Sequence, residues 1–225
     1  MSRRISEQSE AWRRLYHTGV PFKANDNIAG FIDADDIAEM KDKVEVLIGL
    51  TLDALLIDHN NDPNSRGTPK RFAKMLVDEA MRGRYYQCPP VTTFPNTRKL
   101  DEMYTTGPIT LNSMCSHHLV PIIGKAWIGV VPGDRVIGLS KFNRVVEWVA
   151  RRPQIQEELV VQIADELWQR LEQPRGLAVV IEATHLCMTW RGVEESVAAV
   201  MRTNVVRGCF REDAAARAEF FASVK

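Results

Sequence analysis

The sequence is short of cysteine, of net charge and of long apolar runs. Four cysteines in 225 residues are too few for a disulfide scaffold. Basic and acidic residues number 29 each, and this zero net charge argues against a general nucleic-acid-binding protein, which is usually basic. No apolar stretch approaches the length of a membrane span, and the polar N-terminus does not read as a signal peptide. We therefore expect a cytoplasmic protein that binds neither nucleic acid nor membrane.

Apolar residues make up 45% of the chain, which is enough to build a hydrophobic core. The length fits one large domain with an extension. We expect residues 1–34 to form an N-terminal extension, partly helical or flexible, and residues 35–225 to form a single domain. The predicted order is helices, two strands, two helices, two strands and a helix. This order indicates an α+β domain whose antiparallel sheet carries two helices on one face.

Local patterns place the elements of this domain. Apolar residues at helical spacing predict helices that begin near Asp35, Thr68 and Ser140, with Thr68 and Ser140 as N-caps. A further long helix is expected over 154–171 and a short one over 213–221. Alternation of apolar and polar residues predicts four strands. These strands lie near 106–112, 125–131, 177–181 and 196–206.

Soft metal ligands are concentrated in two short stretches, 113–118 and 184–187. Together these stretches hold three of the five histidines and two of the four cysteines. Thiolate sulfur and imidazole nitrogen suit zinc above other metals. Cys115 and His118 are close enough to chelate one ion from a strand end or tight turn, and Cys187 can complete the set from another strand. The pattern predicts a catalytic zinc site with three protein ligands and one position open for water.

In this interpretation His117 and His185 stand beside the metal without binding it. Two free imidazoles there could move protons near neutral pH. Spacing alone leaves two alternatives open. One is a closed structural site in which a second histidine fills the fourth position, and the other is a disulfide between Cys115 and Cys187.

A second group of residues is cationic and is the one basic set that we assign to an anionic ligand. Ser140 at a helix N-terminus adds backbone N–H groups and the positive end of a helix dipole, a natural phosphate site. Glu157 near the next helix start could accept paired N–H donors from a purine. The ordinary alternatives are a solvated helix face for the cations and a favourable helix N-terminus for the carboxylate. The cations are Arg71, Lys74, Lys141, Arg144 and Arg191.

Taken together and in order, these motifs resemble the GTP cyclohydrolase I family over roughly residues 36 to 223. Several separated motifs in the right order make the resemblance specific. They are Thr-Pro-Lys-Arg at 68–71, Ser-Met-Cys-x-His-His at 113–118, Ile-Gly-Leu-Ser-Lys at 137–141, Arg-Pro-Gln-Ile-Gln-Glu at 152–157, His-Leu-Cys at 185–187 and Arg-Gly at 191–192.

The resemblance implies the tunnelling fold, in which antiparallel sheets from several subunits assemble into a barrel. It implies a homo-oligomer, a decamer, with active sites where subunits meet. The implied reaction converts GTP and water to 7,8-dihydroneopterin triphosphate and formate, the first step of folate or tetrahydrobiopterin synthesis, with one Zn²⁺ per subunit.

The resemblance also implies a role for each site residue. Zinc would activate the water that attacks C8 of guanine, and ring opening, ribose rearrangement and reclosure would follow. The implied metal ligands are Cys115, His118 and Cys187. The implied catalytic residues are His185 as proton donor to the purine N7, His117 as a second imidazole, and Ser140 in the ribose rearrangement. Triphosphate contacts are implied for Arg71, Lys74, Lys141, Arg144 and Arg191, and guanine recognition for Gln156 and Glu157.

The sequence departs from the family pattern at two places. Ser116 stands where the family usually has glutamate, which removes a carboxylate from beside the metal. Residues 196–203 are apolar where the family is usually rich in threonine and serine, a change that we expect to repack a subunit interface. Two other functions were weighed. A non-catalytic purine-nucleotide-binding relative with a structural zinc would not need His117, His185 or Glu157, and the related nitrile reductase of queuosine synthesis has no matching motif here.

Overall fold

The structure, a computed structural model, describes residues 9–224 and divides the chain into two compact units. One unit ends at Gln87 and the other begins at Cys88. The predicted extension, residues 1–34, falls within the first unit. Residues 1–8 of that predicted extension lie outside the described residues. Among the described residues, no helix combines the length and apolarity needed to cross a bilayer.

The first unit is helical. Its elements are α2 (Glu10–Thr18), α3 (Ala34–Ala54), α4 (Thr68–Lys74), the π-helix η1 (Met75–Ala80) and α5 (Arg82–Tyr85). Asp33 caps α3 in a capping box with Asp36, which explains why the helix starts at the predicted place.

The prediction that Thr68 caps α4 is wrong by one residue. Gly67 occupies the N-cap and Thr68 is the first helical residue. Pro69 then stands in the first turn, where its missing N–H costs no hydrogen bond.

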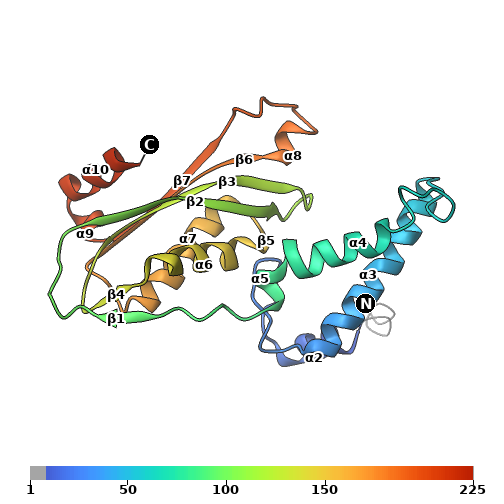
Figure 1. Cartoon of the computed structure of the whole chain (residues 1–225), viewed down its shortest axis with the longest axis horizontal. Helices are drawn as coiled ribbons and strands as arrows, with labels where there is room; N and C mark the ends of the chain where they lie inside the picture. Colours follow the sequence, from blue (N-terminus) through green and yellow to red (C-terminus); the bar gives the residue numbers. More distant parts are fainter. Residues whose placement is uncertain (1–8, 225) are drawn as a thin grey trace. The chain divides into compact units, whose positions relative to one another are not determined.

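The second unit is built on a five-stranded sheet in the order β5-β2-β3-β6-β7 (Figure 1). All neighbours are antiparallel except β2 and β5, which pair in parallel over two residues. A small second sheet pairs β1 with β4. The strands are β1 (Thr93–Pro95), β2 (Tyr104–Cys115), β3 (Pro121–Val131), β4 (Arg135–Ile137), β5 (Pro153–Gln154), β6 (Gly176–His185) and β7 (Met201–Gly208).

Two helices cover one face of the large sheet, which confirms the predicted α+β arrangement (Figure 1). These are α6 (Leu139–Ala150) and α7 (Gln156–Arg170), whose apolar stripes enclose the main core. Fully buried side chains from both layers meet there, and each such burial stabilises the fold by roughly 1.5–3 kcal/mol. They include Leu111, Ile128, Phe142, Val145, Leu159, Ile163, Leu167, Val179 and Ile181.

The helices α9 (Cys209–Glu212) and α10 (Ala214–Ser223) supply a second, smaller core, in which Phe220 packs with Trp127 and Val180. Phe220 packs directly on the backbone of β3, because a Cβ added at Gly129 would lie 2.4 Å from its ring. The two cores together hold β2, β3 and β6 in place, and the functional residues lie at the ends of these strands.

Other predicted boundaries shift as well. Ser140 is not the N-cap of α6, because Gly138 takes that position and Ser140 lies in the first turn. The helix predicted from residue 154 begins at Gln156, because residues 153–154 pair with β2 instead.

The last strand begins at Met201 rather than at residue 196. The β6–β7 ladder ends at the pair Ala183–Met201, although β6 itself continues to His185. Residues 196–199 instead form a turn in which the Ala199 N–H donates to the Ser196 carbonyl at 2.8 Å, which keeps them out of the ladder.

Candidate metal centre

Pairing of three strands, β2, β3 and β6, brings the two ligand stretches together at one end of the sheet. β3 pairs with β2 at Met114–Pro121 and with β6 at Ile122–His185. The last residue of β2, Cys115, therefore lies near the end of β6, where the single turn α8 (Leu186–Thr189) carries Cys187. The tight turn after Cys115 brings His118 back toward the same place. Residues about 70 apart in sequence thus converge because of strand pairing.

Cys115, His118 and Cys187 form a cluster whose ligand atoms all lie within 4.8 Å of one another. The Cys115 Sγ lies 3.7 Å from His118 Nδ1 and accepts a hydrogen bond of 3.3 Å from the His118 backbone N–H. Two sulfurs and one imidazole nitrogen are a donor set that zinc prefers. The residues present therefore fit a metal ion of that kind.

The pKa values of the two thiols of the cluster are shifted in opposite directions. Burial works against ionisation of Cys115, but backbone hydrogen bonds from His118, Val120 and His117 together lower its pKa. Burial and the neighbouring Cys115 raise the pKa of the Cys187 thiol. All four cysteines are free, so the alternative of a disulfide is not realised in this structure.

Within residues 9–224 the cluster has three members, and neither His117 nor His185 belongs to it. His117 is exposed, with its ring centroid 6.2 Å from that of His118. This arrangement favours a metal site with an open fourth position over a closed four-ligand site.

His185 at the end of β6 is half-buried beside the cluster. Its Nε2 lies 2.7 Å from Oε1 of Gln156, the first residue of α7. Burial lowers the pKa of His185, and the Glu157 carboxylate raises it in part. Glu157 is exposed, whereas Gln156, implied by the resemblance as a guanine contact, is fully buried.

The predicted cations are distributed over several elements. Arg191 contacts the metal cluster, because its Nη1 lies 3.0 Å from His118 Nε2. Arginine only donates, so Nε2 is the acceptor there. Lys141 and Arg144 stand in the first turns of α6 with the exposed Ser140, and Arg144 donates a 3.4 Å hydrogen bond to the carbonyl of Pro90.

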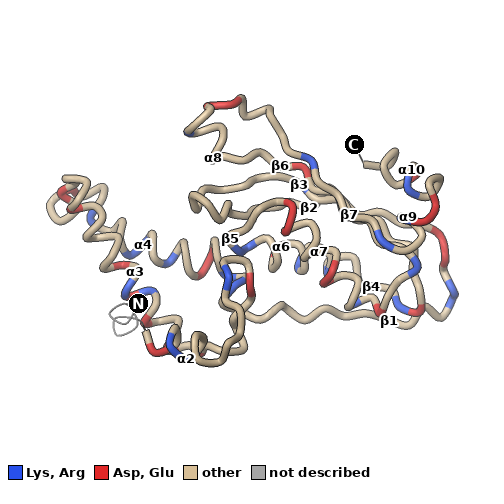
Figure 2. Tube along the Cα trace, turned by 180° about the vertical axis from the view of Figure 1, so that it is seen from behind, with Lys and Arg blue, Asp and Glu red and all other residues tan. Residues whose placement is uncertain are grey.

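Arg71 and Lys74 lie on α4 in the first unit, where both are exposed. Arg71 donates to the carbonyl of Asn64 at 3.1 Å, which anchors the loop before α4. Figure 2 shows basic and acidic residues interleaved along the trace.

An apolar cavity of about 330 Å³ lies against His185. The sequence analysis did not predict this cavity. The apolar segment at 196–203 was the feature of the sequence that could have indicated it. That segment supplies part of the wall. The cavity is lined by His185, Met188, Thr189, Glu195, Ala199, Val200 and Met201.

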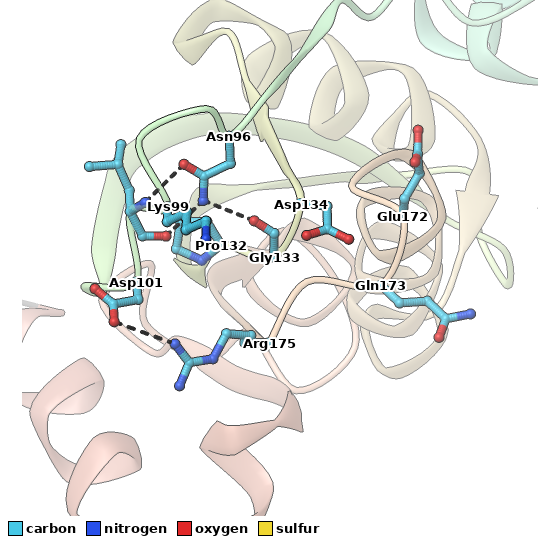
Figure 3. A pocket seen from close by; sticks show the side chains of 10 residues that line it. Asn96, Lys99, Asp101, Pro132, Gly133, Asp134, Glu172, Gln173 and Arg175 are labelled. Atoms are coloured by element: carbon cyan, nitrogen blue, oxygen red, sulfur yellow. Dashed lines mark hydrogen bonds and ion pairs between the residues drawn. The ribbon is translucent and has the colours of Figure 1, made fainter.

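A second cavity, of about 510 Å³, lies away from the metal cluster (Figure 3). β3 runs from Pro121, beside the metal ligands, to Val131, and this cavity lies beyond Val131 at the opposite end. Asn96 ties its walls together by donating to the carbonyls of Leu100 and Gly133, and Arg175 lies 3.8 Å from Asp101. We interpret it as the junction of three surface turns.

Comparison with known proteins identifies the family. A family model described as GTP cyclohydrolase I matches residues 49–225. Proteins named GTP cyclohydrolase 1 are 42% identical in Photobacterium profundum over 83% of this chain and 85% of theirs, and 42% identical in Brevibacillus brevis over 79% and 94%. A third, from Yersinia enterocolitica, is 39% identical over 84% of this chain and 86% of its own.

A solved structure of an archaeosine synthase QueF-Like in the apo form is similar at a TM-score of 0.38, with 14% identity over 48% of this chain and 94% of that one, and we draw no argument from it. The family model covers most of the chain, including every residue of the metal cluster. The chain belongs to the GTP cyclohydrolase I family.

Proposed function

We propose that the chain converts GTP and one water molecule to 7,8-dihydroneopterin triphosphate and formate, using one zinc ion per subunit. The observation that carries the proposal is the three-membered cluster of Cys115, His118 and Cys187, with His185 two residues before Cys187 and held by Gln156, in a chain of this family. A structural zinc site alone would not need an imidazole held next to the cluster.

Zinc is the metal that the donor set favours, because soft thiolates select against magnesium, calcium and manganese. When bound, zinc supplies a Lewis acid that lowers the pKa of water toward about 7. The chain itself supplies the remaining chemistry: it binds the nucleotide, orients the purine and moves protons.

Proton transfer is assigned to His185 at the purine N7, with His117 as the second imidazole near the cluster. Glu157 is exposed next to His185, and a carboxylate there can accept the N1–H and the 2-amino group of guanine in a paired hydrogen bond. Ser140, exposed in the first turn of α6, is assigned to the ribose rearrangement. These roles follow the resemblance, and the positions of the side chains support them.

The triphosphate is assigned to a set of five cations. The N-terminus of α6 adds backbone N–H donors and the positive end of its dipole. The contact between Arg191 and His118 supports a phosphate site next to the metal, because the same guanidinium can reach an anion there. The set is Arg71, Lys74, Lys141, Arg144 and Arg191.

Replacement of Arg144 by alanine is expected to weaken GTP binding about 10- to 100-fold, the value of a charged hydrogen bond, and to leave guanosine binding nearly unchanged. Calorimetry with the zinc-loaded protein would measure both ligands in an H185A background, which slows turnover. R175A removes a cation at the opposite end of the sheet and serves as the control. Equal weakening of GTP and guanosine would remove Arg144 from the phosphate site.

We also propose that the chain assembles as a homodecamer with active sites at subunit interfaces. The two edges of the large sheet support assembly. At one edge β2 is covered by β5 over only two residues, and at the opposite edge β7 is the last strand. Such edges leave backbone groups available to a second copy. Apolar side chains exposed on and after α3, such as Leu47 and Leu56, support a further interface.

Light scattering of the zinc-loaded protein is expected to give a mass ten times that of the 25.5 kDa subunit. L47E should reduce the assembly because it places a charge on an apolar surface, whereas K43E on the same helix should not. A monomer with full activity would contradict the proposal.

The proposed reaction is tested directly by incubating zinc-loaded protein with GTP and following formate release and pterin absorbance. We expect one formate per GTP consumed. Protein that binds GTP and zinc but releases no formate would instead be the non-catalytic purine-nucleotide-binding relative.

A further inference from the structure

Gln156 occupies an unusual position for a polar side chain. It is the first residue of α7, its side chain is fully buried, and it bridges α7, β6 and β7. A buried amide is costly unless its polar atoms are paired, so the partners define what it does.

The partners of the amide nitrogen fix the orientation of the group. Nε2 of Gln156 lies 3.0 Å from the carbonyl oxygen of Met201, 3.4 Å from that of Ile181 and 3.1 Å from Oγ1 of Thr203. Backbone carbonyls only accept hydrogen bonds, so the atom that faces two of them must be the NH₂ group. The other atom, which faces His185, is therefore the amide oxygen.

The orientation of the amide in turn fixes the proton on His185. An amide oxygen only accepts, and it lies 2.7 Å from His185 Nε2. A hydrogen bond of that length requires the proton to be on Nε2. Within residues 9–224, His185 Nδ1 has no hydrogen-bond partner, so it is the ring nitrogen left for a ligand.

We propose that Gln156 is a positioning residue that holds His185 as its Nε2–H tautomer and directs Nδ1 to the proton exchange with guanine. This inference rests on the proposed function for its reaction, but the tautomer belongs to the protein itself. Gln156 then contributes to turnover through His185, and recognition of guanine remains with Glu157. Gln156 acts through the orientation and the tautomer of the ring, which the four hydrogen-bond distances fix, and Nδ1 is the ring atom at which a proton is exchanged with N7 of guanine.

The tautomer is measured first, on the zinc-loaded wild-type protein labelled with ¹³C and ¹⁵N in histidine. Solid-state NMR correlates each ring nitrogen with its carbons, and the signal absent from H185A identifies His185. We expect a neutral ring protonated at Nε2. A ring protonated at Nδ1 would overturn the proposal, whether or not the protein turns over GTP.

Kinetics separate positioning from a direct guanine contact. Q156M keeps the volume of the side chain and removes its hydrogen bonds, and we expect kcat to fall roughly 10- to 100-fold, the loss typical when the partner that orients a functional imidazole is removed. KM for GTP and the zinc content should stay near wild type. Q162M makes the same change on the same helix at a half-buried site and serves as the control.

Q156E tests rescue. In its protonated form this side chain retains an oxygen that accepts from His185 Nε2 and an O–H that donates to the Met201 carbonyl, so we expect more activity than in Q156M. A rise in KM with unchanged kcat in Q156M would make Gln156 a guanine contact, and wild-type kcat would show that it has no role. If Q156M does not fold, the wild-type tautomer and the Q156E kinetics still decide.

If the wild-type protein consumes no GTP, the proposed function fails, and the NMR measurement still tests the Gln156–His185 interaction. If the protein is active but Nδ1 carries the proton, the proposed function stands and this inference fails. The two failures are therefore distinguishable.

Discussion

Replacement of His185 by alanine is expected to lower kcat for formate release by roughly 10²–10⁴-fold, the range lost when a positioned proton-transfer group is removed. The zinc content should stay at one ion per chain, because His185 is not a member of the metal cluster. Its Nε2 is occupied by the hydrogen bond of 2.7 Å to Gln156. The variant should therefore separate metal binding from turnover.

The zinc content of H185A can be measured by elemental analysis after dialysis, and GTP binding by calorimetry. H59A is a suitable control, because His59 lies in the first unit, where it pairs with Asp53 at 3.2 Å. Loss of metal from H185A would mean that this histidine fills the fourth position of a closed site. Unchanged turnover would remove it from the reaction.

The metal cluster could be predicted from the sequence because its signal is local. Cys115 and His118 lie three residues apart after a strand, so any tight turn there brings them together. Cys187 needed one more step, the strand that ends at His185, and the pairing of Ile122 with His185 supplies it. The two helices on one sheet face were also predictable, since their apolar stripes are long and periodic.

The orientation of Gln156 could not be predicted in the same way. Adjacent helical residues point in different directions, and only the packed structure shows that Gln156 turns inward while Glu157 remains exposed. The carbonyls that fix its amide come from β6 and β7, more than 20 residues away. A short motif that contains both residues carries no information about which one faces the ligand.

The boundaries that shifted have physical causes outside their own segments. Ser140 is a good N-cap by residue type, but the chain enters the helix at Gly138, directly after β4. Residues 196–200 have the apolar character of a strand, but a turn closed by the Ala199 N–H and the Ser196 carbonyl keeps them out of the β6–β7 ladder. In both cases the backbone around the segment, and not the residue type alone, sets where the helix or strand begins.

Replacement of Cys187 by serine is expected to remove both the metal and the activity. Serine keeps the shape of the side chain, but its hydroxyl is a hard and weakly acidic donor where zinc prefers a thiolate. Loss of a residue that only hydrogen-bonds to a metal ligand lowers metal affinity roughly 10- to 100-fold. Because Cys187 is itself a proposed ligand, we expect zinc affinity to fall by more than that. After dialysis the zinc content should approach zero, and formate release should fall with it.

C209S is the matched control, because Cys209 is also half-buried and free but lies outside the cluster. Retention of zinc and turnover by C187S would contradict the assignment of this ligand. The stability of C187S then distinguishes the two kinds of zinc site. The main core is closed by side chains from α6, α7 and the sheet, and Cys187 only packs against it as a partly buried residue, so we expect only a small change in thermal unfolding. Unfolding of the metal-free variant would instead indicate a structural ion, since structural zinc supplies folding energy directly and catalytic zinc need not.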